Sequence, residues 1–199
     1  MYRKDRKEDF YTTLAKKEGY PARSIYKLKE IDEKYRIIKK GDWVLDLGSA
    51  PGSWILYLSQ KVGDKGKVVG IDLEEVKIQS KRNIVLLKKN IFGLQGLDFK
   101  NKFDIVVSDL APKTSGVKSL DSGRSLELTE KSFEIAKSVL MLGGNFVCKI
   151  FEGKENDEFF KRVGDSFVFA KRFKPKAVIK KSREFYIVAK GYTEKIDGK

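Results

Sequence analysis

The sequence predicts an α/β protein built on a doubly wound sheet that is mostly parallel and ends in an antiparallel strand. Short apolar runs alternate with stretches of helical periodicity from residue 43 onward, and this alternation is typical of βαβ units. The last two runs have no convincing helix between them, so they can pair as a hairpin that reverses the final strand. A chain of 199 residues suits one domain, because single cores stop growing at roughly 250–300 residues.

Residues 1–40 are expected to form a basic helical arm that packs on the same domain. They hold thirteen Lys and Arg against seven Asp and Glu. Within the arm, Ile25, Leu28, Ile31 and Tyr35 recur at spacings near three and four, which indicates an amphipathic helix over 23–35. The charged turn at 39–42 ends this helix, and residues 41–199 are expected to form the main α/β unit.

The apolar runs and the periodic stretches predict the elements of that unit in order. The expected strands are 43–47, 67–71, 84–87, 103–107, 145–151, 166–169 and 185–189. The expected helices are 52–61, 126–140, which Gly143 and Gly144 stop, and 156–163. With right-handed crossovers, these elements make a Rossmann-like sandwich in which the first five strands take the order 3-2-1-4-5.

Composition limits the class of protein and its partners. No apolar run approaches the roughly 20 residues that cross a bilayer, the charged N-terminus lacks a signal-peptide core, and Cys148 has no second cysteine, so we expect a cytoplasmic protein. The absence of His excludes imidazole as a base or metal ligand. A net charge of +14, with seven Lys and Arg and no acid in 171–183, favours a nucleic-acid partner over uniform solubilising charge or a membrane surface.

The loop after the first strand is expected to hold a cofactor, because ligands of open α/β sheets bind at the carboxyl ends of the strands. It reads Asp46-Leu47-Gly48-Ser49-Ala50-Pro51-Gly52-Ser53-Trp54. This is not the glycine spacing that seats a pyrophosphate, so a nucleoside cofactor without phosphates, such as S-adenosylmethionine, fits better. Asp72 ends the second strand and can bind ribose hydroxyls, although alone it is equally an ordinary turn residue. Trp54 is as consistent with a core position as with cofactor contact.

Three charged residues are expected to meet beside this loop. Lys149 lies within an apolar strand, where an unpaired ammonium is costly to bury. Asp109 ends the fourth strand, next to the fifth in the predicted order, and Glu184 begins the antiparallel last strand at the same edge. Topology does not place Lys27, which by itself is an ordinary solvated lysine of the basic helix.

Five segments of the chain resemble the FtsJ/RrmJ family of RNA ribose 2′-O-methyltransferases. They are residues 23–28, 46–54, 108–112, 147–151 and 182–188, in the family's order. The resemblance implies a methyltransferase-type sheet and a catalytic tetrad of Lys27, Asp109, Lys149 and Glu184. It also implies S-adenosylmethionine contacts at Gly52, Trp54, Asp72, Asn90 and Asp109, in addition to the loop positions Gly48, Ala50 and Pro51. Asn90 stands where relatives have aspartate, and Ser53 where they often have glycine.

The implied reaction is an in-line methyl transfer to a ribose hydroxyl, with Lys149 as the base and no metal. A lysine accepts a proton near neutral pH only where burial or a nearby cation, such as Lys27, destabilises its ammonium form. The expected phosphate contacts are Arg3, Lys4, Arg6, Lys7, Arg23, Lys174, Lys176, Lys180, Lys181 and Arg183. Large-subunit ribosomal RNA is the favoured substrate, and a tRNA anticodon loop is the alternative.

Three other functions are less consistent with the sequence. An oxidoreductase is disfavoured by the glycine spacing and by Lys149. A base methyltransferase is disfavoured because the segment 109–112 has no aromatic residue to stack a planar target. A non-catalytic RNA-binding module is disfavoured by the complete tetrad.

Overall fold

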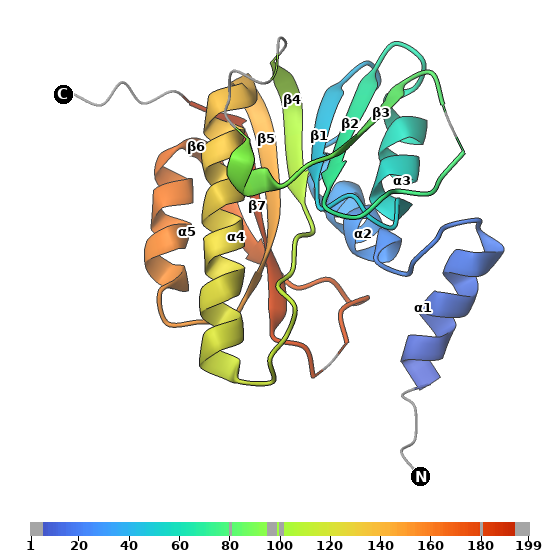
Figure 1. Cartoon of the computed structure of the whole chain (residues 1–199). Helices are drawn as coiled ribbons and strands as arrows, with labels where there is room; N and C mark the ends of the chain where they lie inside the picture. Colours follow the sequence, from blue (N-terminus) through green and yellow to red (C-terminus); the bar gives the residue numbers. More distant parts are fainter. Residues whose placement is uncertain (1–5, 80, 95–98, 100–101, 180, 194–199) are drawn as a thin grey trace.

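The structure is a computed structural model that describes residues 6–79, 81–94, 99, 102–179 and 181–193. Within these ranges, seven strands form one sheet, flanked by helices (Figure 1). The strands are β1 (Trp43–Leu47), β2 (Lys67–Asp72), β3 (Ile84–Lys88), β4 (Phe103–Ser108), β5 (Leu140–Phe151), β6 (Phe167–Phe173) and β7 (Glu184–Tyr192). The helices are α1 (Arg6–Lys17), α2 (Ile25–Tyr35), α3 (Ser53–Val62), α4 (Lys118–Val139) and α5 (Asn156–Asp165), with a 3₁₀ turn, η1, at Ile91–Gly93.

The order of the strands is β3-β2-β1-β4-β5-β7-β6. Strands β1 to β5 run parallel to one another, whereas β7 is antiparallel to both β5 and β6. The predicted order and the antiparallel last strand are therefore confirmed. Because β7 runs against β5, its first residue lies at the edge where the parallel strands end.

The sheet has an apolar core on each face, because successive side chains of a strand point to opposite sides. Helices α4 and α5 pack on one face, where they cover Phe146, Cys148 and Ile150 of β5 (Figure 1). Helices α2 and α3 pack on the other face, against Val147 and its neighbours. This alternation assigns every second residue of each central strand to the α2 side of the sheet.

Helix α2 is part of the core on its side of the sheet. The side chains of Ile25, Leu28 and Ile31 are fully buried, as the periodicity of the segment predicts. Helix α1 lies against α2 through the ring of Tyr11, whose centroid is 5.2 Å from that of Tyr26. In the described part of the chain, no helix is long and apolar enough to cross a bilayer.

Several boundaries differ from the predicted ones: β5 begins at Leu140 rather than at residue 145, β6 runs to Phe173 and β7 runs to Tyr192. Helix α4 begins at Lys118 rather than at residue 126, because its first turns bury polar residues such as Asp121 and Ser125 and therefore lack an apolar stripe. The helix ends at Val139, so Gly143 and Gly144 lie in β5 rather than stopping the helix. At this point the β4–β5 register shifts, and a Cβ on Gly144 would lie 2.9 Å from the carbonyl oxygen of Asp104.

Candidate active site

The four charged residues singled out by the sequence form two ion pairs on the α2 side of the sheet. The ammonium nitrogen of Lys149 lies 3.0 Å from Oδ1 of Asp109, with the two side chains 6% and 16% exposed. The ammonium nitrogen of Lys27 lies 2.5 Å from Oε1 of Glu184, with exposures of 12% and 13%. The structure therefore brings Lys27, which topology alone does not place, to the same edge of the sheet.

The strand registers explain this convergence. Ser108 of β4 is paired with Cys148 of β5, so Asp109 and Lys149 follow side by side. Across the other side of β5, Lys149 is paired with Tyr186 of β7. Glu184 lies two residues before Tyr186 and therefore on the same face, where α2 crosses the sheet with Lys27 in its first turn.

Lys149 and Tyr186 hold Asp109 in one position. The ammonium of Lys149 also donates a hydrogen bond to the backbone carbonyl of Asp109 at 2.6 Å. The hydroxyl of Tyr186 donates to Oδ1 of Asp109 at 2.7 Å. Tyr186 is not among the residues predicted from the sequence, although its place two residues after Glu184 in a strand is a signal that indicates a shared face.

The pKa shifts in this cluster agree with the hydrogen bonds. Burial raises the pKa of the Asp109 carboxyl, but the charges of Lys149 and Lys27 and the Tyr186 hydroxyl outweigh burial and leave the pKa below its usual range. Burial and the nearby Asp109 carboxylate raise the pKa of Tyr186 well above its usual value. At neutral pH, Asp109 is therefore an anion and Tyr186 a neutral hydrogen-bond donor.

The predicted cofactor loop lies at the carboxyl end of β1. The carboxylate of Asp72 accepts the backbone N–H groups of Ala50 at 2.9 Å and Glu74 at 2.8 Å, which ties the end of β2 to the loop. Gly48 and Gly52 have left-handed φ angles of 84° and 111°, which favour glycine. A Cβ on Gly48 would lie 2.9 Å from the side chain of Leu110, so the loop can pass the Asp109–Leu110 segment only with glycine there.

Asp46 is a buried carboxyl beside this loop. Both of its oxygens, and the hydroxyl of Ser49, have no hydrogen-bond partner within the described residues. Burial, and then the carboxylates of Asp109 and Asp72, raise the pKa of Asp46 well above its usual range. Three neighbouring carboxyl groups and unpartnered polar atoms at a strand edge favour a ligand that carries hydrogen-bond donors and positive charge. S-adenosylmethionine is a nucleoside with a sulfonium and an amino group, so it carries the positive charge and the donors that these oxygens favour.

The remaining predicted cofactor residues lie in the loop segment or after β3. Trp54 is buried, and its indole N–H donates to the carbonyl of Ser24 at 3.0 Å, so it links the loop to the start of α2. Pro51 follows a cis peptide bond. Asn90 is exposed at the start of η1, where its Oδ1 accepts the N–H of Phe92 at 3.0 Å. The N–H of Lys89, the residue before Asn90, donates to the carbonyl of Asp72 at 3.0 Å.

The predicted phosphate contacts lie in two segments. Near the active edge, Arg183 donates to the carbonyl of Lys118 and the hydroxyl of Ser122, and Lys174 donates to the carbonyl of Ser182. Exposed positions are taken by Lys176 and Lys181, and Arg23 is half-buried before α2. Arg6 and Lys7 belong to α1. Arg3, Lys4 and Lys180 lie outside the described residues.

Comparisons with known proteins identify close sequence relatives and similar solved structures. The FtsJ-like methyltransferase family matches residues 20–192. A ribosomal RNA large subunit methyltransferase E from Desulfatibacillum aliphaticivorans is 45% identical over 94% of this chain and 91% of its own. A crystal structure of a protein assigned as a ribosomal RNA methyltransferase from Plasmodium falciparum superposes with a TM-score of 0.77, at 27% identity over 87% of this chain and 98% of that one. An S-adenosylmethionine-dependent O-methyltransferase from Thermotoga maritima, at 15% identity and a TM-score of 0.56, covers 84% of this chain and 65% of its own and shares the fold.

Proposed function

Because the chain belongs to the FtsJ-like methyltransferase family, we propose that it transfers a methyl group from S-adenosylmethionine to a ribose 2′-hydroxyl in RNA. The observation that carries this proposal is the buried pair of Lys149 and Asp109 beside the cofactor loop. A lysine and a carboxylate at this edge can position a hydroxyl group and remove its proton.

The bound donor supplies a methyl group that its sulfonium already activates. The chain then has to hold the ribose hydroxyl in line with that methyl group and accept the hydroxyl proton as the new C–O bond forms. Lys149 is the proposed acceptor of that proton, after it has given up one of its own. Asp109 orients the Lys149 amine through its carbonyl and Oδ1.

The second ion pair is proposed to bind the ribose from the α2 side. Lys27 brings a positive charge to the cluster, which helps to lower the pKa of Asp109. Glu184 neutralises Lys27 and can accept a hydrogen bond from a sugar hydroxyl. Both side chains retain some exposure, so an RNA strand can reach them.

The favoured substrate is ribosomal RNA of the large subunit, in the cytoplasm. The relatives that carry this function in their names are 40–45% identical to the chain over nearly its whole length. The basic residues Lys174, Lys176, Lys181 and Arg183 near the active edge are proposed to contact its phosphates, together with Arg23. Methylation of a tRNA anticodon loop is the alternative, and parallel assays on the two RNAs distinguish them.

The proposal is tested by Lys149→Ala, assayed for transfer of labelled methyl groups to large-subunit RNA from cells that lack this activity. Loss of a general base predicts a fall in kcat of about 10²-fold or more. Calorimetric titration with S-adenosylmethionine should show that cofactor binding survives. Lys161→Ala, which removes an exposed lysine of α5, is the control for a lost charge.

Three results would contradict the proposal. Turnover of Lys149→Ala close to wild type would remove Lys149 from the role of base. A methyl group mapped to a nucleobase, which leaves the adjacent phosphodiester sensitive to alkali, would exclude the ribose hydroxyl as the acceptor. Binding of NAD instead of S-adenosylmethionine would point to oxidoreductase chemistry.

A further inference from the structure

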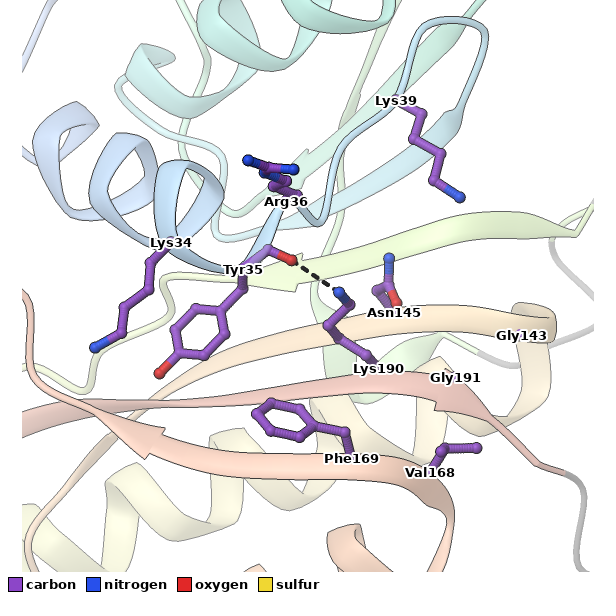
Figure 2. A pocket seen from close by; sticks show the side chains of 10 residues that line it. All are labelled: Lys34, Tyr35, Arg36, Lys39, Gly143, Asn145, Val168, Phe169, Lys190 and Gly191. Atoms are coloured by element: carbon purple, nitrogen blue, oxygen red, sulfur yellow. Dashed lines mark hydrogen bonds between the residues drawn. The ribbon is translucent and has the colours of Figure 1, made fainter.

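A basic pocket lies at the edge of the sheet opposite the active site (Figure 2). We call it the distal pocket; it has a volume of about 590 Å³ and lies between the end of α2 and the strands β5, β7 and β6. The lining residues that matter here are Lys34, Tyr35, Arg36, Lys39, Phe169 and Lys190. None of them is among the residues that the sequence predicts to bind RNA or cofactor.

The distal pocket is separate from the catalytic cluster. Asn145, which lines the pocket, is paired with Lys190, whereas Lys149 lies four residues further along β5. At about 3.3 Å per residue, this separation is roughly 13 Å along the strand. Helix α2 connects the two places, with Lys27 in its first turn and Lys34 in its last.

The charge of the distal pocket favours an anion. Its ten lining residues include four cations, Lys34, Arg36, Lys39 and Lys190, and no acid. Within the described ranges, none of these four takes part in an ion pair. Lys190 donates instead to the neutral carbonyl of Tyr35 at 2.8 Å. Lys39 interacts electrostatically with the Asp42 carboxyl, and Lys34 lies beside Glu30 and Glu33 on its other side. Four cations around one cavity without an acid in its lining still repel one another, and an anionic ligand relieves that repulsion.

Aromatic rings stand beside these cations. Phe169 is 40% exposed in β6, and its ring centroid is 6.0 Å from that of Tyr35. Figure 2 shows Phe169 and Val168 on one side of the pocket and Arg36 and Lys39 on the other. An exposed ring next to cations is the combination with which proteins stack a base and bind its phosphate.

The backbone at Arg36 supports a functional role for its side chain. Arg36 caps α2 in the left-handed conformation, with φ 50° and ψ 58°, and no other non-glycine residue in the described ranges has a positive φ. Glycine is the residue that adopts this conformation without steric cost. An arginine here reduces stability and places a guanidinium group at the pocket.

We propose that the distal pocket binds a nucleotide of the substrate RNA at a distance from the methylated ribose. Arg36, Lys39 and Lys190 bind phosphate groups, and a base stacks on Phe169. The pocket thereby anchors the RNA at one end of α2 while Lys27 and Glu184 contact it at the other. This inference rests on the proposed function, because it takes the substrate to be RNA.

The test compares Arg36→Gly and Lys39→Ala with Lys40→Ala, which removes an adjacent exposed lysine outside the pocket. Arg36→Gly separates binding from folding, because glycine suits the left-handed backbone. Each pocket variant should weaken binding of large-subunit RNA about tenfold and reduce the slope of log affinity against log salt by about 0.7–0.9. KM for RNA should rise while kcat at saturating RNA and the affinity for S-adenosylmethionine stay unchanged.

Other outcomes overturn the inference in distinguishable ways. Wild-type affinity in both pocket variants, or an equal loss in Lys40→Ala, would show that the pocket contributes no more than general charge. Normal binding of free RNA with impaired methylation of the intact ribosomal subunit would assign the pocket to a ribosomal protein. If the wild-type chain binds and methylates no RNA, the proposed function fails and this inference fails with it.

Discussion

Asp46 illustrates how a single residue can be placed for a ligand rather than for stability. A buried carboxyl without a hydrogen-bond partner destabilises a fold, because desolvation is not offset by new bonds. Asp46 is fully buried at the end of β1, with Asp72 and Asp109 as neighbours that raise its pKa further after burial itself. A cationic donor in the cofactor loop would supply the missing partner.

The raised pKa of Asp46 predicts that binding of S-adenosylmethionine depends on pH. Without ligand, the folded chain favours protonated Asp46, which contributes stability below the pKa of the unfolded chain and loses it as pH rises through the folded pKa. A cationic ligand favours the carboxylate, so binding below that raised pKa releases a proton and strengthens as pH rises. Titration calorimetry in two buffers of different ionisation enthalpy measures the release.

The matched variant for this prediction is Asp46→Asn, which keeps the size of the side chain and removes its titration. We expect weaker cofactor binding and loss of the proton release. Asp64→Asn, at an exposed turn after α3, serves as the control. Unchanged proton release in Asp46→Asn would show that another group titrates on binding.

Helix α2 is the element that joins the cofactor loop, the catalytic cluster and the distal pocket. Its start is tied to α3 by the Ser53 hydroxyl, which accepts the N–H of Ala22 at 2.7 Å and donates to the carbonyl of Ala22 at 3.0 Å. The bond from Trp54 to Ser24 adds a second tie. Hydrogen bonds from the first turn of α3 therefore link the cofactor loop to the start of the helix that carries Lys27.

Ser53→Ala should loosen this connection. Two hydrogen bonds to a partly buried backbone are lost, so we expect the free energy of unfolding to fall by about 1–3 kcal/mol in urea titrations. Methyl transfer should also slow, because Lys27 is no longer held against Glu184. Ser138→Ala, whose hydroxyl is bonded within its own helix, is the control. A variant with lower stability but wild-type kcat would show that the tie does not position Lys27.

At the end of α2, a substitution is expected to raise the free energy of unfolding rather than lower it. Arg36→Gly should raise the free energy of unfolding by about 1 kcal/mol, because the left-handed conformation at φ 50° strains any residue with a Cβ. Arg36→Ala, which keeps the Cβ, should not show this gain. Chemical denaturation of the two variants beside wild type measures the difference, and equal stability of the glycine and alanine variants would contradict it.

For the whole molecule, the net charge of +14 includes two groups of basic residues that lie apart on the sheet. The four cations of the distal pocket lie at the opposite edge of the sheet from Lys181 and Arg183, which come just before β7. An RNA that follows α2 between them would meet Lys34, Lys174 and Lys176, which lie beside the acids Glu30 and Glu33. Long-range attraction of this kind accelerates association and is screened by salt.

We therefore expect the affinity for RNA to fall steeply with salt. If the two edges together engage six or more phosphates, the affinity should drop about 10³-fold between roughly 50 and 200 mM salt. Binding of S-adenosylmethionine, which lacks phosphates, should change little over the same range. Filter binding and calorimetry measure the two responses, and a flat RNA curve would exclude the phosphate contacts proposed at both edges.

Local sequence patterns predict the sheet, the loop after β1 as the cofactor site, and three of the four residues of the candidate active site. Apolar runs that end in Asp or Gly mark the strands and their ligand-binding ends. The carboxyl ends of neighbouring parallel strands meet at one edge, so Asp109 and Lys149 become neighbours once the strand order is known. The last strand is antiparallel to β5, so its first residue, Glu184, lies at that edge. These are consequences of local patterns and of topology.

How the helices cross the sheet follows from the packing of the whole chain. The angle and position of α2 depend on the fit of side chains from α2, α3 and five strands, so no local pattern shows that Lys27 meets Glu184 or that Lys39 and Phe169 border one pocket. The first turns of α4 were not predicted because their buried residues are polar and form no apolar stripe. Burial of Asp46 without a partner among the described residues is likewise a property of the packed chain, since desolvation is set by all the atoms around a group rather than by its neighbours in sequence.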